Sequence, residues 1–217
     1  MLKGINYWAF PGEEGGCGTD IPAAIRRAKE IGFDCIELTV ERTGPLSLQS
    51  EEADVTLLRK EAEKTGIELK TLASGLAWEV PQTHPDPSVR VESVEAYKKV
   101  LRIAGWLGID TLLYIPGMVS AVFVPDFEPQ PYDLVYERAK AALAEILPEA
   151  EKRGITLGVE NVWNRFLLSP LEMRTFIDSF GSSAVGSYFD VGNVMLTGHP
   201  EHWISILGER IKAVHLK

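Results

Sequence analysis

The eight residues Gly154-Ile-Thr-Leu-Gly-Val-Glu-Asn161 decide the fold of this sequence, because three different structural signals meet in them. The glycine at the start suits the left-handed residue that ends a helix. The apolar run that follows is short and nearly continuous, as in a parallel strand buried on both faces. A carboxylate and an amide, Glu160 and Asn161, then close the run. The stretch predicts a helix end, a buried strand and a polar site where that strand ends.

The same joint occurs three more times upstream. Gly32-Phe33, Gly66-Ile67 and Gly108-Ile109 each separate an amphipathic segment from a short apolar run. Strands and helices that alternate in this way form βαβ units, in which right-handed crossovers join parallel neighbours. We expect strands at 3–8, 34–40, 68–74, 111–115, 156–160, 185–190 and 211–216. We expect helices at 21–31 (N-cap Asp20), 51–64 (after Ser50), 88–107, 132–153, from 170 onward (after Ser169) and at 200–207.

An open doubly wound sheet and a closed barrel both fit this alternation. A dinucleotide-binding open sheet carries a glycine-rich turn after its first strand, whereas Trp8-Ala9-Phe10-Pro11 stands there. We therefore predict an α/β fold, a (β/α)8 TIM barrel with seven strands visible and residues 1–217 in a single domain. Closure would need an eighth strand, so we expect a C-terminally truncated form of a longer protein. Loops 11–18, 81–87 and 124–131 are expected on the active-site face.

The composition narrows the classes of partner. The chain carries 31 acidic and 22 basic residues, a formal net charge of −9, and such a surface repels nucleic acid. The sequence contains neither a recognisable signal peptide nor an apolar stretch of about 18 residues that could span a membrane. The two cysteines, Cys17 and Cys35, fit reduced thiols rather than a disulfide framework. We expect a cytoplasmic protein that binds neither nucleic acid nor membranes.

Three consecutive strands end in residues that can hold a metal ion. Glu160 ends the fifth predicted strand, Asp190 the sixth and His215 the seventh. Neighbouring strands lie about 4.8 Å apart, so these side chains can converge on one ion at the carboxyl end of the sheet. Two carboxylates and one imidazole suit Mn²⁺, Mg²⁺, Co²⁺ or Zn²⁺. For single residues the alternatives are a buried glutamate paired with a lysine or arginine, and an aspartate that caps a loop.

The motifs Gly-Val-Glu160-Asn, Tyr-Phe-Asp190-Val-Gly-Asn193 and Ala-Val-His215-Leu-Lys217 resemble the xylose-isomerase-like TIM-barrel superfamily. They are most similar to ketose 3-epimerases and to the isomerases and epimerases of hexulose and pentulose phosphates. The resemblance implies that Glu160 is both a metal ligand and one of two glutamates that move a proton. It also implies that Asp190 and His215 complete three of four ligands, and that a second glutamate on the eighth strand is the fourth.

The predicted function is a metal-dependent isomerase or epimerase of a ketose or ketose phosphate. A carboxylate would remove the proton next to the carbonyl, and one divalent ion, for which manganese is a candidate, would stabilise the enediolate. The substrate is a small sugar or sugar phosphate, and the resemblance implies a homo-oligomer. Two alternatives stay open: a metal-dependent dehydratase of an inositol-derived ketone, and a non-catalytic sugar-binding protein.

Five further residues are predicted to contact the substrate. Asn193 follows Asp190 by three positions, and its amide favours the sugar-phosphate branch of the resemblance. Arg165 can grip a substrate oxygen or phosphate, or pair with a surface acid. Trp8 and Trp163 can stack on a sugar or pack in the core. Glu37 can bind the substrate or orient His215.

Overall fold

The computed structural model describes residues 1–10 and 20–217. The predicted loop at 11–18, which contains Cys17, therefore lies outside the described residues. The predicted loops at 81–87 and 124–131 are among the described residues. Cys35 is a free thiol at the start of the second strand.

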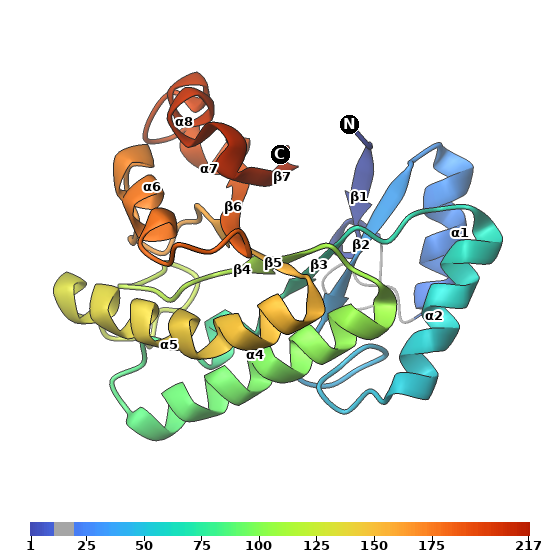
Figure 1. The fold of residues 1–217 in the computed structure, drawn as a ribbon, viewed down its shortest axis with the longest axis horizontal. Helices are drawn as coiled ribbons and strands as arrows, with labels where there is room; N and C mark the ends of the chain where they lie inside the picture. Colours follow the sequence, from blue (N-terminus) through green and yellow to red (C-terminus); the bar gives the residue numbers. More distant parts are fainter. Residues whose placement is uncertain (11–19) are drawn as a thin grey trace.

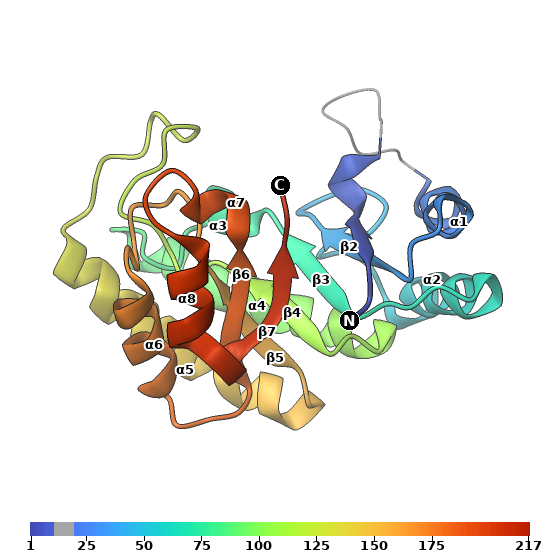
Figure 2. The same ribbon diagram turned by 90° about the horizontal axis from the view of Figure 1, so that it is seen from above.

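Seven parallel strands form one sheet whose spatial order equals their order in the chain. The sheet curls so that the last strand swings back over the first ones, and helices cover its outer side (Figures 1 and 2). This arrangement confirms the predicted α/β barrel fold. The strands are β1 (Gly4–Asn6), β2 (Cys35–Val40), β3 (Thr71–Ser74), β4 (Thr111–Tyr114), β5 (Thr156–Glu160), β6 (Val185–Asp190) and β7 (Ile211–His215).

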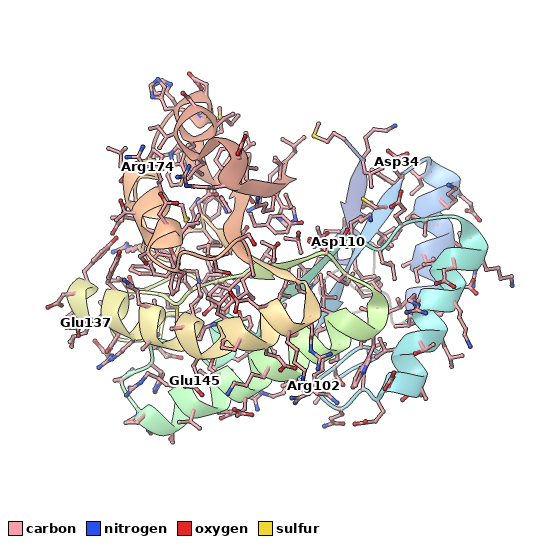
Figure 3. The ribbon with its side chains drawn as sticks, in the orientation of Figure 1. Asp34, Arg102, Asp110, Glu137, Glu145 and Arg174 are labelled. Carbon is pink, nitrogen blue, oxygen red and sulfur yellow. The ribbon has the colours of Figure 1, made fainter. Side chains whose placement is uncertain are left out.

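The six longer helices follow the sequence signals for their ends. Asp20 and Ser169 cap their helices as predicted, by accepting from the backbone N–H groups of Ala23 and Glu172. Charged side chains such as Arg102, Glu137 and Glu145 point outward from the outer helices (Figure 3). The helices are α1 (Ile21–Ile31), α2 (Glu52–Thr65), α4 (Pro87–Leu107), α5 (Tyr132–Arg153), α6 (Pro170–Asp178) and α8 (Pro200–Leu207).

Short helical turns occupy the mouth of the curled sheet, and the sequence pattern did not predict them. They follow strands directly: η1 (Tyr7–Ala9), α3 (Leu76–Glu79) and α7 (Val191–Val194), whereas η2 (Gly208–Arg210) precedes β7. Each of the first three begins within two residues of the strand end. These turns therefore fix where the side chains at the strand ends point.

Three predicted boundaries are wrong. The first strand stops at Asn6, because the Asn6 side chain accepts from the backbone N–H of Trp8 and turns the chain into η1. The third strand begins at Thr71 rather than at residue 68, where only an isolated bridge pairs Glu68 with Cys35. Ser50 does not cap α2, since its hydroxyl accepts from the backbone N–H of Ser47 instead.

Two apolar clusters hold the sheet. The larger one lies between the outer face of the sheet and the helices, and a block of aromatic rings around Phe166 and Phe176 anchors the segment after β5 to α5 and α6. The smaller cluster fills the inside of the curl below the mouth, with Leu113, Ile115 and Tyr188 among its members. Together they hold the ends of β5, β6 and β7 rigidly. In the described part of the chain, no helix is both long and apolar enough to cross a bilayer.

Candidate metal centre and active site

Glu160, Asp190 and His215 meet at the carboxyl end of the sheet. Strand register brings them together, because Glu160 pairs with Tyr188 and Asp190 pairs with His215. One ligand atom of each residue lies within 4.8 Å of the others. Glu160 and Asp190 are buried and His215 is partly buried. The structure therefore brings the three predicted ligands into one cluster.

The two oxygens of the Asp190 carboxylate have different partners. Oδ1 accepts from the backbone N–H of Asn193 at 2.8 Å and so caps the turn α7. Oδ2 is fully buried, and among the described residues it accepts no directed hydrogen bond. The ammonium of Lys217 lies 2.9 Å from Oδ2 as an ion-pair partner. Loop capping and metal binding, alternatives at the level of the sequence, thus involve different oxygens of the same side chain.

The side-chain amide of Asn161 holds the backbone of Asp190 in place. The side chain of Asn161 donates to the carbonyl of Asp190 at 2.8 Å and accepts from its N–H at 2.9 Å. Asn193 donates in turn to the carbonyl of Asn161 at 2.9 Å. The ends of β5 and β6 are joined by these reciprocal bonds, so the distance between Glu160 and Asp190 is set by rigid backbone.

Glu37 lies behind His215 and holds its ring. His215 Nε2 is 2.8 Å from Glu37 Oε1, which also accepts from Asn6 at 2.6 Å. The hydroxyl of Tyr188 donates to the other oxygen of Glu37 at 2.5 Å. With Nε2 engaged in this way, Nδ1 faces the cluster and lies 3.9 Å from Glu160 Oε1. Glu37 therefore selects the nitrogen that His215 presents to the site.

The charges in the site shift one another's pKa values. Burial by itself lowers the pKa of His215, but the carboxylates of Glu160 and Glu37 outweigh it and raise that pKa to about 10. Burial and the neighbouring charge of Asp190 raise the pKa of Glu160, against the opposing effect of His215. Burial also opposes ionisation of Glu37, yet its bonds from His215, Tyr188 and Asn6 lower its pKa. Without a metal, the site is an imidazolium between carboxylates.

The donor set fits a divalent ion. Two carboxylates and one imidazole nitrogen converge, and the imidazole has the carboxylate partner on its far nitrogen that metal-binding histidines generally have. Asp190 Oδ2 is fully buried and accepts no directed hydrogen bond among the described residues, so only the ion pair with Lys217 occupies an oxygen that a metal could bind. Oxygen and nitrogen donors of this kind suit Mn²⁺, Mg²⁺, Co²⁺ or Zn²⁺.

A cavity of about 520 Å³ opens directly above the cluster. Its polar end carries side chains from the strand ends: Asn6, Glu160, Asn193, His215 and Lys217. Its walls are mostly apolar, and the aromatic residues among them are Trp8, Trp78, Phe123 and Trp163. A polar, charged end under aromatic walls suits a small ligand that has both hydroxyl groups and apolar C–H faces.

The five predicted substrate contacts divide into two groups. Trp8, Trp163 and Asn193 line the cavity; Trp8 is held by Glu41 at 3.1 Å, and Trp163 donates to the carbonyl of Asn193 at 3.3 Å. Arg165 is exposed and lies along a neighbouring groove. Glu37 lies below the cavity wall, where it contacts His215 rather than the open space.

Sequence reasoning gave no role to three residues that shape the site. Lys217 follows His215 by two positions, just past the end of β7, and its ammonium reaches Asp190. Tyr188 precedes Asp190 by two positions. Asn161 follows Glu160 directly, and its role depends on a partner on another strand. The alternation of strand residues would have identified Tyr188, which lies on β6 with Asp190.

Comparisons with known proteins identify the family of the chain. The family described as xylose isomerase-like TIM barrel matches residues 25–217. SgbU of Escherichia coli (strain K12), assigned as an L-ribulose-5-phosphate 3-epimerase, is 28% identical over 207 residues, which are 90% of this chain and 67% of SgbU. A 2-epi-5-epi-valiolone 7-phosphate 2-epimerase of Actinoplanes sp. (strain ATCC 31044 / CBS 674.73 / SE50/110) is 30% identical over 183 residues, 84% of this chain. The chain spans 62% of that relative's length.

Solved structures resemble the whole described architecture. A D-psicose 3-epimerase from Clostridium cellulolyticum H10, solved with D-tagatose, has a TM-score of 0.83 at 18% identity and is covered over 73% of its length. An L-ribulose 3-epimerase has a TM-score of 0.80 at 20% identity, with 70% of its length covered. In both cases all of this chain is covered. At these identities the likeness concerns the fold. Since the family description matches nearly all of the sequence, the chain belongs to the xylose isomerase-like TIM barrel family.

Proposed function

We propose that this protein is a divalent-metal-dependent epimerase or isomerase of a ketose or ketose phosphate. The observation that carries the proposal is the cluster of Glu160, Asp190 and His215, whose ligand atoms lie within 4.8 Å of one another at the floor of a cavity. Both relatives are named as epimerases of phosphorylated ketones, which agrees with the enzyme class that the sequence predicts.

Glu160 is the base in this proposal. Its carboxylate lies on the cavity floor and takes the proton from the substrate carbon next to the carbonyl. A raised pKa makes a carboxylate a stronger base, and burial and the charge of Asp190 raise that of Glu160. Asp190 and His215 would hold the ion together with Glu160. A bound divalent ion supplies fixed positive charge, which lowers the energy of the enediolate that forms when the proton leaves.

The walls of the cavity orient the substrate. Trp8 and Trp163 offer flat apolar faces to the C–H side of a sugar and reduce the access of water. Asn193 adds a polar contact at the floor of the cavity, beside Asp190. The product depends on where the proton returns: the same carbon from the opposite face gives epimerisation, and the neighbouring carbon gives isomerisation.

Deuterium exchange tests the proposal. The protein is loaded with Mn²⁺ and incubated in deuterated water with a panel of ketoses and ketose phosphates, and label at the carbons beside the carbonyl is followed by NMR. We expect label to enter one such carbon. Chelation should abolish the exchange, and Glu160→Gln should reduce it at least a thousandfold, since general bases contribute about 10²–10⁴-fold and a metal ligand changes as well.

Glu145→Gln is the matched control, because Glu145 is an exposed residue on the outer side of α5 (Figure 3). It should exchange like the unmodified protein. If the protein binds one Mn²⁺ and eliminates water from an inositol-derived ketone, its function is that of a dehydratase rather than an epimerase. Binding of sugars without exchange or elimination would make the protein a non-catalytic binder. A protein that takes up no metal would contradict the proposal.

A further inference from the structure

Lys217 contacts the one oxygen of Asp190 that a metal would use. Its ammonium lies 2.9 Å from Asp190 Oδ2 and donates to Asn193 Oδ1 at 2.8 Å. It also stands over the ring of Trp163, at 5.4 Å from the ring centre. Asp190 Oδ1 is already held by the backbone N–H of Asn193, so Oδ2 is the oxygen left for a cation.

Two cations cannot share that oxygen favourably. A divalent ion binds a carboxylate oxygen at about 2.0–2.2 Å. With the ammonium still in contact, the two positive charges would lie within about 4 Å of each other, in a place with little water to screen them. Asp190 is rigid, because Asn161 and Asn193 bond its backbone and its other oxygen. The lysine side chain is about half exposed and unbranched, so it is the partner that moves.

We propose that Lys217 is a built-in counter-ion, which neutralises Asp190 in the metal-free protein and which the metal displaces into the cavity. The inference rests on the proposed function, since it takes the Glu160, Asp190 and His215 cluster as the metal site. The displaced ammonium keeps its acceptor Asn193 and the face of Trp163 within reach. Among the described residues that line the cavity, Lys217 is the only lysine or arginine.

The charge of the site explains why such a counter-ion is needed. Glu37, Glu160 and Asp190 are all buried, and clustered carboxylates repel one another unless positive charge is close. His215 lies between Glu37 and Glu160, as its two ring nitrogens show. Lys217 serves Asp190, the remaining carboxylate. The metal-free site is thereby kept folded and ready, at the expense of metal affinity.

Substitution of Lys217 separates the two effects. Lys217→Met removes the ammonium, and Lys217→Gln removes the charge while keeping a polar chain of moderate length. The metal-stripped proteins are titrated with Mn²⁺, free Mn²⁺ is read by electron paramagnetic resonance, and thermal melting is recorded with and without saturating Mn²⁺. We expect both variants to bind Mn²⁺ about tenfold more tightly, within the usual range of coupling between two ligands of one site. Without metal, both variants should melt at a lower temperature than the unmodified protein. With saturating Mn²⁺, all three proteins should melt at the same temperature.

Lys212→Met is the control, because Lys212 is exposed on β7, five positions before Lys217, and bonds only the carbonyl of Glu209 in the described structure. It removes the same charge without touching Asp190, and its Mn²⁺ affinity should stay within about twofold of the unmodified protein. Two results would overturn this inference alone, provided that the unmodified protein binds Mn²⁺. One is that neither Lys217 variant binds Mn²⁺ more tightly. The other is that the metal-free variants are as stable as the metal-free unmodified protein. Failure of the unmodified protein to bind Mn²⁺ overturns the proposed function as well.

Discussion

Glu37→Gln tests whether the carboxylate behind His215 holds that ring through charge. Glu37 is buried and receives hydrogen bonds from Asn6, Tyr188 and His215. Glutamine has the same shape, and its carbonyl oxygen can keep the bonds from Asn6 and His215. Its amide group then faces the Tyr188 hydroxyl, which can turn and accept. The substitution therefore removes the negative charge beside the imidazolium and little else.

The expected size follows from that one interaction. A hydrogen bond to a charged partner contributes about 1.5–3 kcal/mol. We expect the free energy of unfolding of the metal-free protein to fall by about 2 kcal/mol at pH 6. For a chain of this length, that loss corresponds to a melting temperature lower by about 4–8 °C. Glu149→Gln is the control, because it breaks a partly exposed pair with Arg153 on α5, at 2.8 Å. Pairs of that kind contribute about 0.3–0.5 kcal/mol.

The effect has a defined pH window. The pKa of His215 is raised from 6.5 to about 10 in the folded protein, so its contribution is complete below pH 6.5 and disappears as the pH approaches 10. The pKa of Glu37 is lowered from 4.5, so its contribution is present above that pH and is lost in acid. The difference between the two proteins should be largest between about pH 5 and pH 6.5 and should shrink at higher pH.

Thermal melting of the chelator-treated proteins, followed by circular dichroism at pH 6 and at pH 9.5, measures this window. The reasoning is refuted if Glu37→Gln melts within about 1 °C of the unmodified protein at pH 6. It is also refuted if the difference between the proteins grows as the pH rises. Either result would mean that His215 is held by packing alone.

Two further predictions concern the metal and the loop after β4. Mn²⁺ binding at pH 7.5 should release about one proton per ion, because the pKa of His215 is about 10 without metal and a ligating imidazole must be neutral. Calorimetry in buffers of different ionisation enthalpy measures this proton release. A binding enthalpy that does not depend on the buffer would contradict the assignment of His215 as a ligand. Gly117→Ala should destabilise the protein by about 3 kcal/mol, since Gly117 has φ +134° and an added Cβ would stand 2.2 Å from Thr83 Cγ2. Gly154→Ala has open space around it, so only its left-handed backbone, at φ +67°, should cost it about 1 kcal/mol by urea denaturation, and equal losses for the two variants would contradict this assignment.

Local signals predicted the architecture well. The helices at 21–31, 132–153 and 200–207 have the predicted bounds, because each ends at a glycine and the first is capped by Asp20, signals that act within one turn of the chain. The first strand ended earlier than predicted, since the apolar run continues through Tyr7 and Trp8 while the Asn6 side chain turns the backbone. Nothing in a pattern of apolar residues reveals such a side-chain cap.

The candidate site was predictable where it depends on strand ends, and unpredictable where it depends on distant pairing. Glu160, Asp190 and His215 could be placed together because parallel strands end at one edge. The contact between Glu37 and His215 joins residues that are 178 positions apart, so no local pattern indicates which of two roles Glu37 takes. Arg165 was proposed for its chemistry, but its backbone has φ +55° and its side chain lies at the neighbouring groove.

The order of the strands has a consequence for when the proposed metal ion can bind. Each strand pairs with its neighbour in sequence, so the sheet can grow outward one unit at a time. The bond from Glu37 to His215 is different, because it ties the second strand to the seventh and forms only when the sheet has curled. An ion held by the last three strands, through a ring oriented by the second, cannot be captured by a half-grown sheet. During refolding, we therefore expect uptake of the proposed ion only after the curl has closed, so that metal binding reports when the sheet is complete.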